Sequence, residues 1–216
     1  MGISWLRGYA ERCVALWCEW SFDRKYHVST RGRISADRLH LRGPNAAQAI
    51  LYMPTHPKAA RLMFEALPIQ DFSQYTFIDL GSGKGRMLFR AAEYPFKRVI
   101  GVELSRELNE TARANIASYT NARQRCTDIT SVNQDAGSFV VPDEPLVVYL
   151  FFPFRQSVME QVLSSLAQSL QRTPRDVLIA YMNPELAHLI DSHPSFRRIS
   201  RGMFFIIYRS TAGKVG

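Results

Sequence analysis

The chain has 216 residues, enough for one α/β domain with an appended segment and too few for two large domains. Hydrophobic residues make up 46% and charged residues 21%, a composition that argues against disorder over most of the length. The formal net charge is +8, and arginine carries more of it than lysine. This charge points to an acidic partner, nucleic acid or anionic lipid, with an evenly solvated basic surface as the alternative.

Cysteine usage and hydropathy indicate a cytoplasmic protein. Cys13, Cys18 and Cys126 lack the C-x-x-C spacing, so we expect neither a disulfide framework nor a zinc site, and no metal elsewhere. No run of 18 uncharged apolar residues occurs, which predicts that no segment spans a membrane. Charged side chains interrupt the apolar N-terminus, so it does not read as a signal peptide.

Residues 1–70 are expected to form a helical cap that helps to shape a substrate site. Apolar residues recur there at helical spacing, namely Trp5, Leu6, Tyr9, Cys13, Leu16, Trp17 and Trp20. This stripe predicts a helix docked on the same domain, with a dimer interface or a membrane-surface helix as alternatives. A second helix is expected over 45–67, interrupted at Pro54 and Pro57 because proline removes a backbone donor.

Residues 71–216 alternate between strand and helix patterns, which indicates a doubly wound, mostly parallel sheet of seven strands. Two patterns near the C-terminus flank Arg201-Gly202 and predict an antiparallel hairpin that completes the sheet. The expected strands are 76–80, 98–103, 131–134, 146–151, 177–181, 196–199 and 203–208, and the expected helices are 84–94, 105–119 and 156–171.

The first of these strands runs directly into a glycine-rich loop, Asp79-Leu-Gly-Ser-Gly-Lys-Gly85. A dinucleotide site would place its third glycine at position 86, which is arginine, and a phosphate-binding P-loop would end in Gly-Lys-Ser/Thr, which is absent. The compact Gly-x-Gly-x-Gly spacing beside Asp79 suits a cationic cofactor without phosphates. S-adenosylmethionine (SAM), with its sulfonium and its amino acid moiety, is such a cofactor.

Acidic residues at the ends of the next two strands extend the predicted cofactor site. Glu103 is placed to accept hydrogen bonds from both ribose hydroxyls, following the acid-to-ribose logic of nucleotide folds. Asp135 ends the third strand and could accept from the adenine amino group, with Asp128 as the alternative for that place. The expected cofactor-binding residues are Asp79, Gly81, Ser82, Gly83, Gly85, Glu103, Leu104, Asp135 and Ala136.

These stretches resemble three motifs of the class I SAM-dependent methyltransferases. The glycine loop resembles the first motif, Gly101-Val-Glu-Leu-Ser105 the second and Asp135-Ala136 the third. The Asp-Leu-Gly-Ser-Gly stretch also looks like that of non-SET protein lysine methyltransferases. Together with Tyr52-Met-Pro-Thr55 and Tyr94-Pro-Phe96, it is similar to an uncharacterised bacterial methyltransferase group. The resemblance implies a Rossmann-like methyltransferase fold, SAM as cofactor and methyl transfer to a protein amine, a nucleic acid or a small molecule.

The chain departs from the amino-directed members of this class after the fourth strand. These members often carry Asn/Asp-Pro-Pro-Tyr/Phe there, whereas this chain has Phe151-Phe-Pro-Phe154, so the polar side chain is missing. The departure speaks against an adenine-N6 or glutamine-amide acceptor. Two histidines, His27 and His56, are candidate general bases, and Tyr149 and Tyr181 are candidates to line the site. The expected substrate-site residues are Tyr52, His56, Phe152, Phe154 and Asn183.

Several alternatives stay open at this point. Phe152 and Phe154 either line an acceptor pocket or pack beneath the next helix. Lys84 and Arg86 either face an anionic substrate or the cofactor carboxylate, or are solvated. For the whole chain, the alternatives to a methyltransferase are a non-catalytic SAM-binding or RNA-binding module and a nicotinamide-dependent oxidoreductase.

Overall fold

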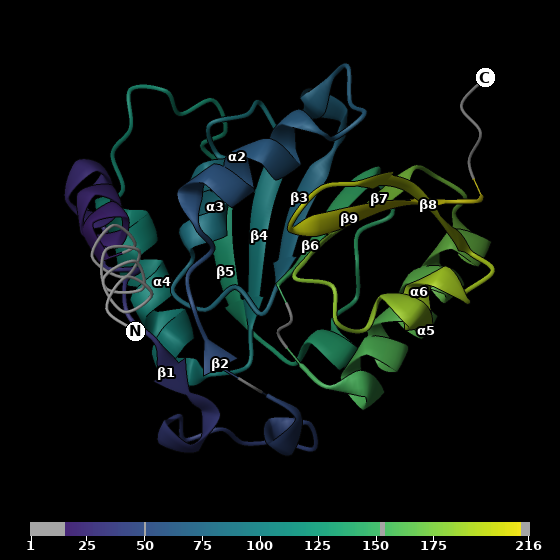
Figure 1. The fold of residues 1–216 in the computed structure, drawn as a ribbon, viewed down its shortest axis with the longest axis horizontal. Helices are drawn as coiled ribbons and strands as arrows, with labels where there is room; N and C mark the ends of the chain where they lie inside the picture. The colour runs from purple at the N-terminus through teal and green to yellow at the C-terminus, as the bar shows by residue number, and fades with distance from the viewer. Residues whose placement is uncertain (1–15, 50, 152–153, 213–216) are drawn as a thin grey trace, which may run out of the picture.

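The computed structural model describes residues 16–49, 51–151 and 154–212, and its centre is one mixed sheet of seven strands (Figure 1). The strand order is β5-β4-β3-β6-β7-β9-β8, with all pairings from β5 to β7 parallel and both pairings of β9 antiparallel. The strands are β3 (Thr76–Leu80), β4 (Arg98–Glu103), β5 (Ile129–Asn133), β6 (Leu146–Phe151), β7 (Val177–Met182), β8 (Phe196–Arg201) and β9 (Phe205–Ser210). This topology confirms the predicted fold class.

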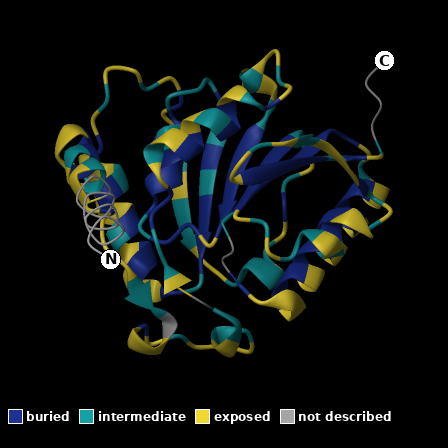
Figure 2. Ribbon diagram, in the orientation of Figure 1, coloured by how far each residue is buried: buried dark blue, intermediate teal, exposed yellow. Residues whose placement is uncertain are grey.

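Helices cover both faces of the sheet, because its central strands are apolar on both sides (Figures 1 and 2). Phe77, Val147 and Leu178 pack with α2 and α3 on one face, and Ile78 and Val148 pack with α5 and α6 on the other. The helices are α2 (Pro57–Glu65), α3 (Arg86–Ala91), α4 (Arg106–Ser118), α5 (Gln156–Arg172) and α6 (Ala187–Asp191).

The helix predicted over 45–67 is correct only in its second half, where α2 begins directly after His56. The first half contains a short 3-10 turn (Ala46–Gln48) and then β2 (Leu51–Tyr52), which pairs antiparallel with β1 (Ile34–Ser35). Two further 3-10 turns (Ala36–Arg38 and Phe72–Gln74) flank this region. Pairing with β1 satisfies backbone groups that a helix would have satisfied internally, so tertiary context overrides the local propensity.

The N-terminal helical segment covers residues 16–26 within the described part of the chain. Phe22 and Tyr26 are buried against Phe89 and Tyr119, and the Tyr26 hydroxyl donates to Glu93 Oε1 at 2.9 Å. The predicted docking stripe is therefore wrong where it can be checked, because its members Leu16, Trp17 and Trp20 are 65%, 65% and 43% exposed. Trp5, Leu6, Tyr9 and Cys13 lie outside the described residues. The division of the chain at residue 70 stays a prediction.

Other predicted boundaries shift by a few residues. Helix α3 begins at Arg86 and not at 84, because Gly85 adopts a left-handed conformation with φ of 87° and caps the helix. Strand β5 begins two residues before the predicted start, and the hairpin strands extend to Arg201 and Ser210. Within the described ranges, no helix combines the length and apolarity needed to cross a bilayer.

Candidate functional site

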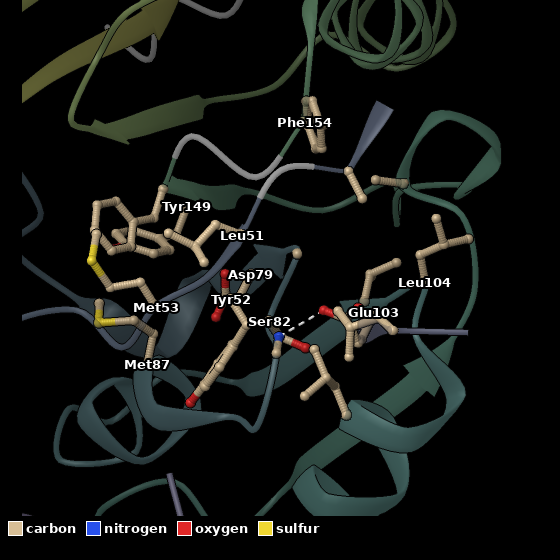
Figure 3. Close-up of a pocket in the computed structure, with 18 of the residues that line it drawn as sticks. Leu51, Tyr52, Met53, Asp79, Ser82, Met87, Glu103, Leu104, Tyr149 and Phe154 are labelled. Atoms are coloured by element: carbon tan, nitrogen blue, oxygen red, sulfur yellow. Dashed lines mark hydrogen bonds between the residues drawn. The ribbon is translucent and has the colours of Figure 1, made fainter. Parts of the chain in front are cut away.

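A pocket opens at the carboxyl ends of β3 and β4, beside β6 (Figure 3). From β3 the chain adds β4 and β5 on one side and then crosses to place β6 on the other side. Such a switch in strand order leaves a crevice at the carboxyl ends of the strands, where doubly wound folds bind ligands. One side of the pocket is the glycine loop with Glu103. The other is residues 39–49 and 51–55, which we call the N-terminal wall.

The glycine loop bends over the end of β4. Gly81 and Ser82 donate their backbone N–H groups to the carbonyl of Val102 at 2.8 and 3.1 Å. Gly83 has φ of 54°, a conformation that side chains with a Cβ rarely adopt. The Ser82 hydroxyl is buried and has no hydrogen-bond partner among the described residues. The loop thus presents a free polar atom beside a backbone shaped for close approach.

Asp79, the last residue but one of β3, has a buried carboxylate, 3% exposed, that lines the pocket (Figure 3). Burial, together with the nearby charge of Glu103, raises the pKa of Asp79 well above its usual range. No hydrogen bond from the described residues offsets this cost. A desolvated acid without a donor suits a ligand that brings a cation or an N–H group.

Glu103 links the two loops at the floor of the pocket. Its Oε2 accepts from the Gly83 N–H at 2.7 Å (Figure 3). Its Oε1 accepts from the Ser105 N–H at 2.8 Å. Burial raises the pKa of this carboxyl group, while these backbone N–H groups oppose the shift. Each carboxylate oxygen has a second lone pair. Glu103 can therefore hold the loops and still accept from a pair of hydroxyls.

The ring of Tyr52 lies directly on the glycine loop. A Cβ at Gly83 would come within 2.3 Å of the Tyr52 Cδ2 and Cε2 atoms. The Tyr52 hydroxyl donates to the carbonyl of Thr30, and the ammonium of Lys84 lies 5.2 Å from the centre of the Tyr52 ring. Lys84 also donates to the carbonyl of Arg31 at 3.0 Å. Strand β2 thus places an aromatic ring over the predicted cofactor loop.

Arg86 is neither solvated nor directed at bulk solvent, because it is 3% exposed. Its Nε donates to Thr30 Oγ1 at 2.8 Å and its Nη2 to Asp23 Oδ1 at 3.4 Å. Asp23 also accepts from the Thr30 and Arg31 N–H groups at 2.9 and 3.0 Å. This buried polar cluster attaches the segment after the N-terminal helix to the first turn of α3.

A largely apolar surface lines another part of the pocket. Its one polar pair is buried: Thr55 Oγ1 and the Tyr149 hydroxyl lie 2.7 Å apart. Burial raises the pKa of Tyr149 well above its usual range. Together with Tyr149, this apolar wall consists of Leu51, Met53, Met87 and Phe154 (Figure 3), and of Phe151.

The N-terminal wall is also attached to the start of α5. The Arg155 N–H donates to the carbonyl of Gln48 at 3.0 Å, and Ala49 forms an isolated bridge with Phe154. The Asn45 amide donates to Gln161 Oε1 at 2.9 Å. The N-terminal wall is therefore attached at two places. Tyr52 is linked through Thr30 to Arg86 of α3, and Gln48 and Asn45 are bonded to the start of α5 and to α5 itself.

The predicted cofactor-binding residues, apart from Gly85, all line this one pocket. A Cβ at Gly85 would meet Leu88 and Ala112, so Gly85 shapes the start of α3 and does not reach the ligand space. Asp135 lies in the pocket and accepts from the Gly137 N–H at 2.9 Å, which caps a short 3-10 turn (Ala136–Ser138). Its alternative, Asp128, is exposed and precedes β5, so it lies at the amino end of that strand, away from the pocket at the carboxyl ends.

The predicted substrate residues divide. Tyr52 and Phe154 line the pocket, and Phe152 lies outside the described residues. His56 is exposed and accepts from the Lys58 N–H to cap α2, so it does not serve the pocket as a base. His27, Tyr181 and Asn183 are also away from the pocket lining. Asn183, with φ of 49°, instead donates its backbone N–H to the carbonyl of Phe204 at 2.8 Å.

Sequence reasoning missed the residues that tie the N-terminal segment to the site. Asp23 and Thr30 lie 63 and 56 positions from their partner Arg86, and no local pattern links them. The sequence also gives no sign of Met87, since a methionine in a helix carries no mark of facing a ligand. Met53 and Thr55 lie within the stretch Tyr52-Met-Pro-Thr55, and the resemblance of that stretch was the one signal for this part of the pocket.

The pocket fits SAM by the chemistry of its free groups. The unpartnered Asp79 carboxylate suits the ammonium and sulfonium, and the remaining lone pairs of Glu103 suit two ribose hydroxyls. Leu104, Leu108 and Ala136 supply apolar contacts next to Asp135, as a flat base requires. The same free acid would repel a pyrophosphate, so the pocket does not suit a dinucleotide.

Comparisons with known proteins agree with this arrangement. A family described as a methyltransferase domain matches residues 77–173, which include β3 to α5. No curated protein matches the chain. Among solved structures, yhhF of Escherichia coli, assigned as a methyltransferase, has a TM-score of 0.56 at 15% identity, over 84% of this chain and 100% of its own.

Two further structures share the fold. The ribosomal protein L11 methylase of Lactobacillus delbrueckii subsp. bulgaricus has a TM-score of 0.51 at 17% identity, over 74% of this chain and 81% of its own. The 23S rRNA methyltransferase ErmE has a TM-score of 0.51 at 13% identity, over 75% and 70%. At these identities the likeness concerns the fold alone. The match of the methyltransferase domain confirms the enzyme class predicted from the sequence, a SAM-dependent methyltransferase, and with it the cofactor.

Proposed function

We propose that this chain transfers the methyl group of SAM to a neutral, planar acceptor, with a nucleobase of RNA as the first candidate. The observation that carries this proposal is the apolar wall of the pocket. Among its described residues no side chain carries a charge, and its hydroxyls, Thr55 and Tyr149, already bond each other. Flat apolar groups bury well against such aromatic and thioether surfaces.

The bound cofactor supplies an activated methyl group on its sulfonium, so the chain has to hold and orient it. Asp79 balances the positive charge, and Glu103 fixes the ribose while it keeps the Gly83 loop in place. Positioning donor and acceptor in line is worth up to about 7–11 kcal/mol of the barrier.

A protein lysine amine fits this wall poorly. Its ammonium would lose its hydration against Met53, Met87 and Phe154 without gaining a partner. It would also need a base to remove its proton, and both candidate histidines lie away from the pocket. A ring nitrogen or ring carbon that attacks without prior proton loss needs no such base.

The net charge of +8 favours a polyanion as the carrier of the planar group. The structural neighbours do not distinguish between a protein and an RNA acceptor, since one is described as a ribosomal protein methylase and another as an rRNA methyltransferase. A small aromatic molecule is the second candidate, favoured by the apolar wall but not by the charge. The alternative of a non-catalytic SAM-binding or RNA-binding module predicts binding without methyl transfer.

Radiolabelled SAM incubated with RNA, protein and metabolite fractions of a bacterial lysate tests the proposal. We expect label in RNA, released as a methylated nucleoside after nuclease digestion and identified by mass spectrometry. The Asp79→Asn protein serves as the matched control, since it removes the charge and keeps the side-chain shape. Label confined to the protein or metabolite fraction would contradict the RNA acceptor, and no transfer to any fraction would favour the non-catalytic module.

A further inference from the structure

The guanidinium of Arg86 is incompletely satisfied by the protein. Nε and Nη2 have partners in Thr30 and Asp23, and Phe22 lies beneath the group with 4.7 Å between the Arg86 Cζ and the ring centre. The third nitrogen, Nη1, is buried and has no hydrogen-bond partner among the described residues. Buried polar groups are nearly always paired, so this nitrogen requires a partner from outside the described residues, either a ligand atom or an ordered water.

The charge of Arg86 is also incompletely neutralised. Among the described residues, its one acidic partner is Asp23 at 3.4 Å. Asp23 also accepts three other hydrogen bonds, from the Thr30 N–H, the Thr30 hydroxyl and the Arg31 N–H. Burial lowers the pKa of the guanidinium, which shows that desolvation is not fully offset. A second anion near Nη1 would complete the shell of this cation.

Arg86 lines the same pocket as Asp79 and the glycine loop. The pocket therefore contains a buried carboxylate without a hydrogen-bond donor, Asp79, and a buried guanidinium cation with a free N–H, Arg86. The two residues flank the glycine loop in the sequence. An α-amino acid in its zwitterionic form carries the two opposite charges that match this pair. We propose that Arg86 Nη1 donates to the carboxylate of the cofactor's amino acid moiety, while Asp79 faces its ammonium group.

The fixed geometry of arginine is essential to this role. Its planar fork lets Thr30 and Asp23 hold two nitrogens so that the third keeps one direction. A lysine would offer a single rotating ammonium that Asp23 could capture completely. The inference rests on SAM as the cofactor and not on the identity of the acceptor.

Calorimetry with two ligands tests the assignment. S-adenosylhomocysteine carries the amino acid moiety, and 5′-methylthioadenosine has the same nucleoside without it. We expect Arg86→Met to weaken the binding of S-adenosylhomocysteine at least tenfold and to leave that of methylthioadenosine within twofold. Arg86→Lys should weaken the binding of S-adenosylhomocysteine by a smaller factor than Arg86→Met does, and should leave the binding of methylthioadenosine unchanged.

Arg90→Met is the matched control, because Arg90 lies on the same helix and pairs with Glu93 at 3.0 Å, outside the pocket lining. We expect this variant to bind both ligands as the wild type does. Circular dichroism and thermal unfolding of each apo protein verify that the variants fold, and Arg86→Lys carries the test if Arg86→Met does not.

The outcomes are distinguishable. An equal loss for both ligands in Arg86→Met, or an unchanged ratio of the two affinities in every Arg86 variant, would overturn the carboxylate role and leave Arg86 a structural residue. A wild-type protein that binds neither ligand would instead refute the use of the cofactor itself. Binding of both ligands by the wild type, with the ratio shifted only by Arg86 variants, supports the assignment.

Discussion

Asp79 and Tyr149 are register partners on the adjacent parallel strands β3 and β6, at the point where the strand order changes direction. Partners in register point to the same face of the sheet, so the acid of the cofactor site and the hydroxyl of the apolar wall share one surface. The charge of Asp79 adds to burial in raising the pKa of Tyr149. The cofactor site and the apolar wall thus adjoin at this one pair of residues.

Substituting Gly83 by alanine should force the ring of Tyr52 away from the glycine loop and weaken cofactor binding. The added methyl would lie 2.3 Å from two ring carbons of Tyr52, at a φ of 54°. We expect at least a tenfold loss of S-adenosylhomocysteine affinity by calorimetry. Gly32→Ala is the control, since its φ is 92° but no atom lies within 4 Å of the added methyl. It should show only the backbone cost of about 1 kcal/mol, and equal ligand affinities in both variants would refute the prediction.

Asp79→Asn should change how stability depends on pH. Burial raises the pKa of Asp79, so the folded protein holds this proton more tightly than the unfolded chain. The resulting stability is fully present below the unfolded pKa of about 3.9 and is lost as pH rises through the folded pKa. In urea unfolding of the apo proteins, the free energy of unfolding of Asp79→Asn should therefore increase relative to that of the wild type from about pH 4 upward. Parallel profiles of the two proteins would contradict this expectation.

The same carboxylate should make ligand binding depend on pH in the opposite direction. The ionised form of Asp79 attracts the ammonium of the ligand, so wild-type affinity for S-adenosylhomocysteine should increase as pH rises through the raised pKa. Asp79→Asn should bind more weakly and lose most of this dependence. Calorimetry at a series of pH values measures both, and a wild-type affinity that falls with pH would rule the role out.

Glu103→Gln should weaken both nucleoside ligands, unlike the Arg86 variants. Glutamine keeps the shape but has a single acceptor oxygen, so it cannot serve Gly83, Ser105 and two ribose hydroxyls together. A hydrogen bond to a charged group is worth about 1.5–3 kcal/mol, which predicts a loss of roughly tenfold or more for S-adenosylhomocysteine and methylthioadenosine alike. A loss for S-adenosylhomocysteine alone would assign Glu103 to the amino acid moiety instead.

Thr55 and Tyr149 should be strongly coupled in a double-mutant cycle. Thr55→Val leaves the Tyr149 hydroxyl without its partner at 2.7 Å, and Tyr149→Phe leaves the Thr55 hydroxyl alone. Each single change should cost about 1–3 kcal/mol of unfolding free energy, while the double change should cost little more than one of them. Urea unfolding measures the cycle, and additive effects would show that the two hydroxyls do not depend on each other.

The sheet was largely predictable because its strands have strong local patterns. The runs at 76–80, 98–103 and 146–151 are bounded by turn residues and are confirmed residue for residue. Buried parallel strands must be apolar on both faces, and few other structures produce such short apolar runs. The Gly-rich bend and the acids that follow β4 and β5 could then be placed at one edge.

The N-terminal part could not be predicted in the same way. The Ala-rich run before Leu51 has a high helix propensity, yet Leu51 and Tyr52 pair with Ile34 and Ser35. The ion pair of Arg86 with Asp23 bridges 63 positions, and only the folded chain brings the two together.

The placement of β2 has a consequence for the kinetics of turnover. Tyr52 lies on Gly83 and Thr55 is bonded to Tyr149, so the ribbon made by β1 and β2 and the residues that follow it pack against one side of the pocket. Opening the pocket on that side requires these few contacts to break. Motions of this kind, and not the chemical step, limit turnover in many enzymes.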